Sequence, residues 1–120
     1  MKRILNLTQH QATPAQVAAG VVEPSDKAHV QALLTFNTLE DTYHMRERAL
    51  RLVGVTLGVD CDAVMVGGAP FFMPTLVAVM QEHDVKVVFA FSVRESVEVT
   101  NPDGTVTKRS SFSHAGWVEG

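Results

Sequence analysis

Two adjacent glycines follow an apolar stretch near the middle of the chain, in the segment Gly67-Gly68-Ala69-Pro70. Residues 63–66 before them are all apolar, as expected for a strand that is buried on both faces of a parallel sheet. Glycines at the carboxyl end of such a strand let a ligand approach the main chain, and the N-terminus of a following helix attracts anions. We therefore take Gly67, Gly68 and Ala69 as candidate ligand-binding residues. The alternative is a strand-to-helix turn without a ligand.

Polar side chains also follow the first short apolar stretch, near residues 4–7. If this stretch is a central parallel strand, Thr8, Gln9 and His10 lie at its carboxyl end, beside the glycine turn. Such side chains can contact the phosphate, ribose or base of a nucleotide, and a histidine can also move a proton. The alternative is that the three residues only stabilise a loop.

A third group of polar residues follows the apolar stretch 85–91 and contains Ser92, Arg94 and Glu95. Arg94 is the best-placed cation of the C-terminal half for holding a phosphate. Strand alternation puts Glu95 on the face of the valines at 93, 97 and 99, where a carboxylate needs a partner or water. Exposed charges on an edge strand are the alternative interpretation of both residues.

His114 lies close to Gly116 and Trp117 and can act as a general acid or base, or donate a hydrogen bond to a phosphate. The candidate catalytic residues are therefore His10, Arg94 and His114. A solvated histidine at the end of a strand is the alternative for His114.

Neither a metal centre nor a cofactor is expected from the sequence. No two histidines are spaced four residues apart, and Cys61 is the single cysteine. The glycine turn matches neither the dinucleotide-binding fingerprint nor the Walker motif, so it implies neither NAD nor ATP.

Helices are expected between the strands. Thr13, Pro14 and Gln16 form a capping-box pattern with proline in the first turn. Four helices are expected: from Thr13 to Gly20, from Ser25-Asp26 to Leu33 or Leu34, from Thr38 to Gly54 or Gly58, and from Pro70 to His83. Residues 21, 22 and 24 belong to a connector between the first two helices.

The segment Asn101-Pro102-Asp103-Gly104 is a strong turn signal between the long apolar stretch and residues 105–114. Helices alternating with strands, followed by this hairpin, predict one α/β domain over residues 1–120. Its sheet is Rossmann-like and mostly parallel, is flanked by helices, and ends in a C-terminal antiparallel β-hairpin. A three-residue loop predicts four facing pairs in the hairpin: Asn101 with Thr105, Glu98 with Lys108, Arg94 with Phe112, and Ser92 with His114.

The composition excludes several classes of function. With 120 residues, of which 46% are hydrophobic and 19% charged, the chain is globular and forms one domain. A formal net charge of -3 gives no basic excess for duplex nucleic acid, although main-chain amides can still hold a small anion. One cysteine and the lack of a leader or membrane-spanning segment predict a cytoplasmic protein without a membrane partner.

Several segments resemble a family of small proteins of bacteria, phages and other mobile elements. The resemblance covers most of the chain. The layout is similar to the Rossmann-like ring nucleases linked to type III CRISPR systems and to CRISPR-associated Rossmann-fold (CARF) domains. The segments that carry it are Ile4-Leu5-Asn6-Leu7-Thr8-Gln9-His10, Ala12-Thr13-Pro14, Gly67-Gly68-Ala69-Pro70-Phe71, Phe91-Ser92-Val93-Arg94-Glu95-Ser96 and Phe112-Ser113-His114-Ala115-Gly116.

This resemblance implies that a homodimer binds a cyclic oligoadenylate across its two-fold axis. Such nucleases work without metal, since a ribose 2′-hydroxyl attacks the adjacent phosphorus. Gly67 and Gly68 would then receive the phosphate, and Arg94 would offset the developing charge. His10 or His114 would move a proton, and Thr8 or Ser92 would orient the attacking group.

Two other functions remain open at this stage. The first is a module of the same fold that senses or sequesters a nucleotide without cleaving it. The second is a phage-borne interaction protein without a small-molecule site, a reading that suits the lack of a basic patch.

Overall fold

The computed structural model describes residues 3–120, without the side chains of residues 94, 95, 97 and 109–113. Within this range the chain forms a five-stranded sheet in the order β2-β1-β3-β4-β5. β1 pairs in parallel with β2 and β3, β3 pairs in parallel with β4, and β5 runs antiparallel to β4. The predicted α/β layout is confirmed. The elements are β1 (Ile4–Leu7), α1 (Pro14–Ala18), β2 (Val21–Val22), α2 (Lys27–Leu34), α3 (Thr42–Leu57), β3 (Ala63–Val66), α4 (Met73–Glu82), β4 (Val87–Thr100) and β5 (Val106–Glu119).

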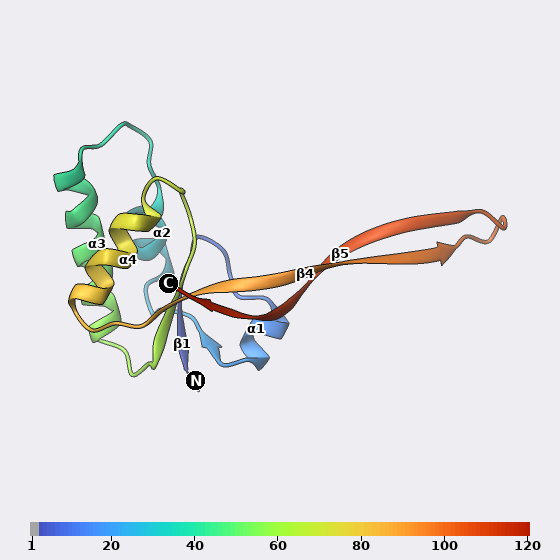
Figure 1. The fold of residues 1–120 in the computed structure, drawn as a ribbon, viewed down its shortest axis with the longest axis horizontal. Helices are drawn as coiled ribbons and strands as arrows, with labels where there is room; N and C mark the ends of the chain where they lie inside the picture. The colour runs from blue at the N-terminus through green and yellow to red at the C-terminus, as the bar shows by residue number, and fades with distance from the viewer. Residues whose placement is uncertain (1–2) are drawn as a thin grey trace.

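Three helices, α2, α3 and α4, cover one face of the sheet (Figure 1). Their apolar side chains meet those of β1 and β3, whose residues are all buried and, apart from Asn6, all apolar. Burial of these side chains supplies most of the driving force for folding. The central residues of this core are Leu5, Leu7, Leu52, Val64, Val66, Phe72, Leu76 and Val79.

The opposite face of the sheet has a smaller core. Ile4, Met65 and Val88 are buried there, and the ring of Trp117 from β5 packs against them. Strand alternation places Asn6 on this second face, and its side chain is fully buried. A buried amide in an otherwise apolar strand must find hydrogen-bond partners, and these partners shape the site described below.

The last two strands form a long arm. β4 and β5 have 14 residues each, and β3 pairs only with Val87 and Val88 at the start of β4. Figure 1 shows the remainder of the two strands leaving the helices as a twisted ribbon. The predicted pairings of Ser92 with His114 and of Glu98 with Lys108 are confirmed, and a β-bulge lies between Phe91 and Ser92.

The helix starts are partly as predicted. The capping box of α1 is present, because Gln16 N donates to Thr13 Oγ1 at 3.2 Å and Gln16 Oε1 accepts from Thr13 N at 3.0 Å. The expected cap of α3 at Thr38 is wrong, since Asp41 caps this helix and accepts from His44 N at 2.9 Å. An aspartate is the stronger N-cap.

The connector expected at residues 21, 22 and 24 is also partly wrong, because Val21 and Val22 form β2. This short strand pairs in parallel with Ile4 and Leu5 of β1. Two adjacent valines carry no alternation pattern, so only the tertiary contact reveals the strand.

Arg48 of α3 holds the end of α2 in place. Its Nη1 donates to the main-chain oxygens of Ala32, Leu33 and Thr35 at 3.1, 3.0 and 2.9 Å. The guanidinium also pairs with Glu40 and lies 4.4 Å from the ring centroid of Phe36. A cation at this position satisfies the carbonyls that end a helix and opposes its dipole.

Two glycine substitutions form a matched test of the backbone. An added Cβ meets no atom within 4 Å at Gly54 or at Gly116, but Gly116 has φ +150° whereas Gly54 lies inside α3. We expect Gly54→Ala to raise the free energy of unfolding by about 0.5–1 kcal/mol. Gly116→Ala should lower it by roughly 1–3 kcal/mol. Urea unfolding measures both values, and equal effects would contradict the backbone argument.

Candidate functional site

A pocket of about 440 Å³ lies at the carboxyl ends of β1 and β3, beside Phe89 and Ala90 near the start of β4. The loop after β1 and the glycine turn after β3 form two of its walls, and a Cβ placed on Gly67 would lie 3.4 Å from Thr8 Cγ2. The candidate residues Thr8, Gln9, His10, Gly67 and Gly68 therefore lie together. The full lining is Thr8, Gln9, His10, Gln11, Thr13, Gln16, Met65, Val66, Gly67, Gly68, Phe89 and Ala90.

The strand order explains why a hollow forms at this place. From β1 the chain crosses to β2 on one side, while β3 lies on the other side of β1. The connections that leave the carboxyl ends of neighbouring strands then run in opposite directions and leave a crevice between them. Ligands of open α/β sheets bind in this crevice.

The buried amide of Asn6 fixes the loop that follows β1. Its Oδ1 accepts from Thr8 N at 3.0 Å and from Thr8 Oγ1 at 2.7 Å. Its Nδ2 donates to His10 O at 2.8 Å and to Glu23 Oε1 at 2.9 Å. Both ends of the amide are thus used, and the main chain of residues 8–10 is held in one path.

Glu23 and Lys27 complete this network. Glu23 Oε2 accepts from Ala12 N at 2.8 Å, and Lys27 Nζ lies 3.3 Å from Glu23 Oε1. Lys27 Nζ also donates to Thr8 O at 2.7 Å and to His10 O at 2.9 Å. Partial burial works to raise the pKa of Glu23, but the hydrogen bonds from Ala12 and Asn6 and the charge of Lys27 outweigh it and lower this pKa.

Two of the predicted ligand-binding side chains are used within the protein. The hydroxyl of Thr8 donates to Asn6, and Gln9 Nε2 donates to Thr35 Oγ1 at 2.9 Å. Gln31 Nε2 donates in turn to Gln9 O at 2.9 Å. These contacts tie the loop to α2, so Thr8 and Gln9 shape the pocket wall as well as line it.

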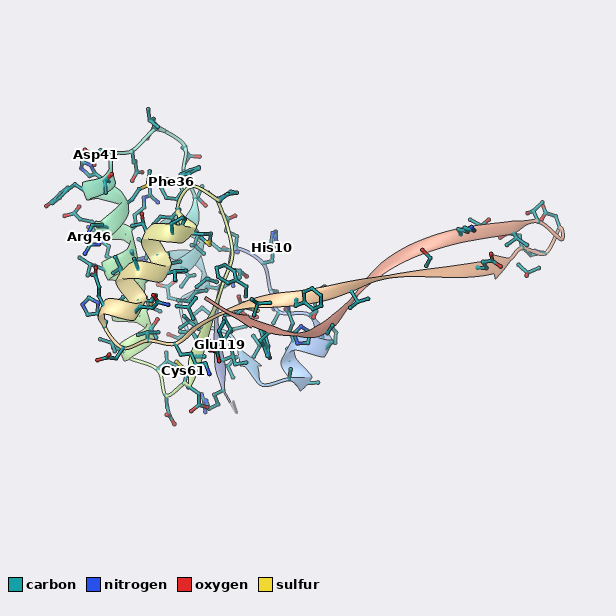
Figure 2. All side chains as sticks on the ribbon, viewed as in Figure 1. His10, Phe36, Asp41, Arg46, Cys61 and Glu119 are labelled. Atoms are coloured by element: carbon teal, nitrogen blue, oxygen red, sulfur yellow. The ribbon has the colours of Figure 1, made fainter. Side chains whose placement is uncertain are left out.

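His10 is an exposed residue of this loop. Figure 2 shows its side chain at the protein surface, close to the base of the arm, and Phe89 and Ala90 of β4 line the same pocket. Its main-chain oxygen accepts from both Asn6 and Lys27. The network therefore positions His10 through its backbone and leaves the imidazole outside these contacts.

The glycine turn presents main-chain groups to the pocket. Gly68 has φ +149°, a conformation that favours glycine, and a Cβ there would lie 3.6 Å from Met73 Cε. Gly67 and Gly68 both belong to the pocket lining, so their main-chain amides lie at its wall. Such amides can donate to an anion. Ala69 follows them, and its carbonyl accepts from Phe72 N at 3.0 Å.

The helix expected from Pro70 starts later, and that prediction is wrong. α4 begins at Met73, after a turn, so Pro74 lies in its first turn. A helix that began at Pro70 would carry Pro74 in its interior, where the proline ring clashes with the preceding turn and one hydrogen bond is lost. The N-terminus of α4 is consequently separated from Gly68 by residues 69–72.

The remaining predicted residues lie on the arm. Ser92 is exposed, faces His114 in the register, and is two residues beyond Ala90 of the pocket lining. The ring of His114 lies 4.6 Å from that of Trp117, and its buried Nδ1 has no hydrogen-bond partner among the described residues. The side chains of Arg94 and Glu95 lie outside the described part of the chain.

Sequence reasoning missed the residues that organise the pocket. Asn6, Glu23 and Lys27 carry the network, and Gln11 and Gln16 belong to the lining. One signal was available: an asparagine between two leucines of a buried strand is a polar residue that needs a partner. The partners themselves are distant in sequence and have no pattern that links them.

The structure defines the class of this protein as a small α/β protein with a Rossmann-like sheet and a pocket at its switch point. In the described residues, no cluster of three His, Cys, Asp or Glu side chains is arranged to hold a metal ion, and no helix is long and apolar enough to cross a bilayer. The family described as "Uncharacterized protein MJ1673 family" matches residues 2–118, so the chain belongs to this family. No curated protein and no solved structure matches significantly.

Asn6→Asp tests the network by exchanging one atom of the side chain. The new carboxylate would face the carboxylate of Glu23 in a buried position, where like charges repel and no proton is donated. We expect the free energy of unfolding at pH 7 to fall by at least about 2 kcal/mol. Asn37→Asp, at an exposed position, is the matched control and should change stability little. Equal stabilities of the two variants would contradict the role of Asn6.

Glu23→Gln tests the charge of the same network. Because the pKa of Glu23 is lowered by folding, its carboxylate stabilises the native state above its ordinary pKa of 4.5, and this contribution is lost as the pH falls through the lower folded value. The variant should be less stable than the wild type at pH 7, and the difference should shrink below pH 4.5. Thermal unfolding at several pH values measures it. Glu98→Gln, at an exposed position of the arm, is the matched control and should change stability little at pH 7.

Proposed function

We propose that the pocket binds the phosphate–ribose backbone of a cyclic oligoadenylate, and that the protein cleaves this ligand as a metal-independent ring nuclease. The activity would tune or counteract type III CRISPR signalling. The observation that carries the proposal is the meeting of the glycine turn with the loop of residues 8–11 at the switch point between β1 and β3. The main chain of two glycines and an exposed histidine come together there.

The size and chemistry of the pocket support a nucleotide. A volume of about 440 Å³ is within the range of small-ligand sites. The amides of Gly67 and Gly68 suit a phosphate, while the polar side chains of Gln11 and Gln16 suit a ribose or a base. A cyclic oligonucleotide is larger than one such pocket. Two copies of the chain around a two-fold axis would hold it together.

The reaction requires no water and no metal in its first step. The 2′-oxygen of one ribose forms a bond to the adjacent phosphorus, and the bond from phosphorus to the 5′-oxygen breaks. The 2′-hydroxyl loses its proton and the departing 5′-oxygen gains one, which leaves a 2′,3′-cyclic phosphate and a 5′-hydroxyl. His10 serves as the proton carrier, and the glycine amides stabilise the charge on the phosphoryl oxygens.

Residues of the arm also act on the ligand in this proposal. Ser92 orients the attacking hydroxyl, Arg94 offsets the negative charge, and Glu95 contacts the ligand. His114 is the second candidate for the proton transfer. We place the protein in the cytoplasm, in keeping with the free thiol of Cys61.

Binding without cleavage is the second candidate function. Among the described residues that line the pocket, His10 is the single titratable group. Cleavage through an acid and a base would draw its second group from outside this lining. A module that only sequesters or senses the nucleotide needs no second group.

The test incubates the protein with cyclic tetra-adenylate and cyclic hexa-adenylate in EDTA and identifies products by mass spectrometry. We expect linear products with a 2′,3′-cyclic phosphate. His10→Ala should slow cleavage roughly 100- to 10,000-fold, because it removes the proton carrier. His29→Ala, at an exposed position of α2 outside the pocket, is the matched control and should keep the wild-type rate.

Each other outcome selects a different function. Tight binding without products supports the sequestering module. The absence of binding to either ring would reject a nucleotide site and leave an interaction protein. Equal cleavage rates of His10→Ala and the wild type would remove His10 from the reaction and direct attention to His114.

A further inference from the structure

The end of α2 lies behind both walls of the pocket. Leu34 is the last residue of α2, and a Cβ placed on Gly68 would lie 4.0 Å from Leu34 Cδ2. On the side of the other wall, Gln9 Nε2 donates to Thr35 Oγ1 at 2.9 Å. The glycine turn and the loop after β1 therefore contact the same short stretch of chain. We call residues 34–36 the support segment.

Phe36 adds a second contact on the side of the glycine turn. It packs against the main core on the helical side of the sheet (Figure 2). Its ring centroid lies 5.0 Å from that of Phe71 and 5.1 Å from that of Phe72. Edge-to-face and tilted contacts of this kind stabilise a pair of rings beyond the burial of their area. Both partners lie between the glycine turn and α4, so the position of Phe36 constrains the path of the turn.

The support segment is itself held by Arg48 of α3. The last carbonyl oxygens of a helix have no partner within that helix, and Arg48 Nη1 donates to Leu33 O at 3.0 Å and to Thr35 O at 2.9 Å. The same guanidinium lies 4.4 Å from the ring centroid of Phe36. The side chain is 22% exposed and pairs with Glu40. Contacts that are largely withdrawn from water are screened little by salt.

We propose that Arg48 is a positioning residue that sets the distance between the glycine turn and the loop after β1. It lies outside the pocket lining and acts through the support segment. A lysine would keep the charge but would lose the planar group that stacks on a ring and donates several N–H bonds. The inference rests on the proposed reaction, in which the glycine amides receive the phosphate while His10 reaches the proton. The distance between the two walls then governs the rate.

The first experiment needs no ligand and compares Arg48→Lys with Arg46→Lys. Arg46 lies on the same helix and pairs with Glu82 of α4 at 2.9 Å, so its substitution also alters one ion pair of α3. Amide resonances of residues 8–10 and 67–68, measured by NMR, report the two walls of the pocket. We expect Arg48→Lys to shift the resonances of both walls. The matched control Arg46→Lys should leave both in place.

A role confined to the end of α2 would give a different result. Arg48→Lys would then lower the stability in urea and move the resonances of residues 34–36, while those of residues 67–68 stayed unchanged, and this outcome would overturn the proposal. Phe36→Leu replaces Arg48→Lys if that variant does not fold. It removes the ring contacts and should shift the resonances of residues 67–68, so an unchanged glycine turn in this variant is equally fatal.

The second experiment measures the cleavage of cyclic tetra-adenylate in EDTA by the same variants. Arg48→Lys should lower kcat about 10- to 100-fold and change KM less, because a misplaced wall disturbs the aligned reaction more than the binding of the ring. Arg46→Lys should keep the wild-type kcat, and an equal kcat in Arg48→Lys would exclude the positioning role. A wild type that neither binds nor cleaves the ring refutes the proposed function instead. The NMR resonances then still decide whether Arg48 sets the distance between the walls.

Discussion

One buried amide determines the shape of the candidate site. Asn6 lies fully buried in a strand whose other residues are apolar, so each of its polar atoms must be paired inside the protein. The path of residues 8–10 satisfies its oxygen and part of its nitrogen, and Glu23 satisfies the remainder. Lys27 then binds the carbonyls of the same loop. The need of a buried amide for hydrogen-bond partners thus determines the geometry of a surface pocket.

The site combines a fixed part and an extended part. In the body, α2 supports the loop after β1 through Thr35, and Arg48 holds the end of α2 in turn. The pocket wall therefore has support in two successive layers. The arm has no such layers in the described chain, because its strands contact chiefly each other. Residues in the body are positioned by the fold, whereas residues on the arm depend on what the arm packs against.

Local chemistry and strand direction allowed much of this structure to be predicted. The turn residues Pro102 and Gly104 and the alternating side chains of the flanking strands predict the register of the hairpin. The parallel direction of the strands predicts that Thr8 lies beside Gly67. The role of Asn6 could not be predicted, because the pairing of β2 with β1, which brings Glu23 close to it, has no signal in the sequence. The late start of α4 follows from Pro74, because a proline is tolerated in the first turn of a helix that begins at Met73 but not in the interior of one that begins at Pro70.

The C-terminus is fastened to the body rather than to the arm. Gly120 N donates to Val87 O at 2.9 Å, and Gln81 Nε2 donates to Gly120 O at 3.1 Å. The arm is consequently held to the body at both of its ends, at Val87 and at Gly120. Adding or removing two residues in each strand at the tip keeps the alternation of the two faces and leaves Phe89 and Ala90, the β4 residues that line the pocket, in place. The length of the arm is therefore structurally independent of the pocket.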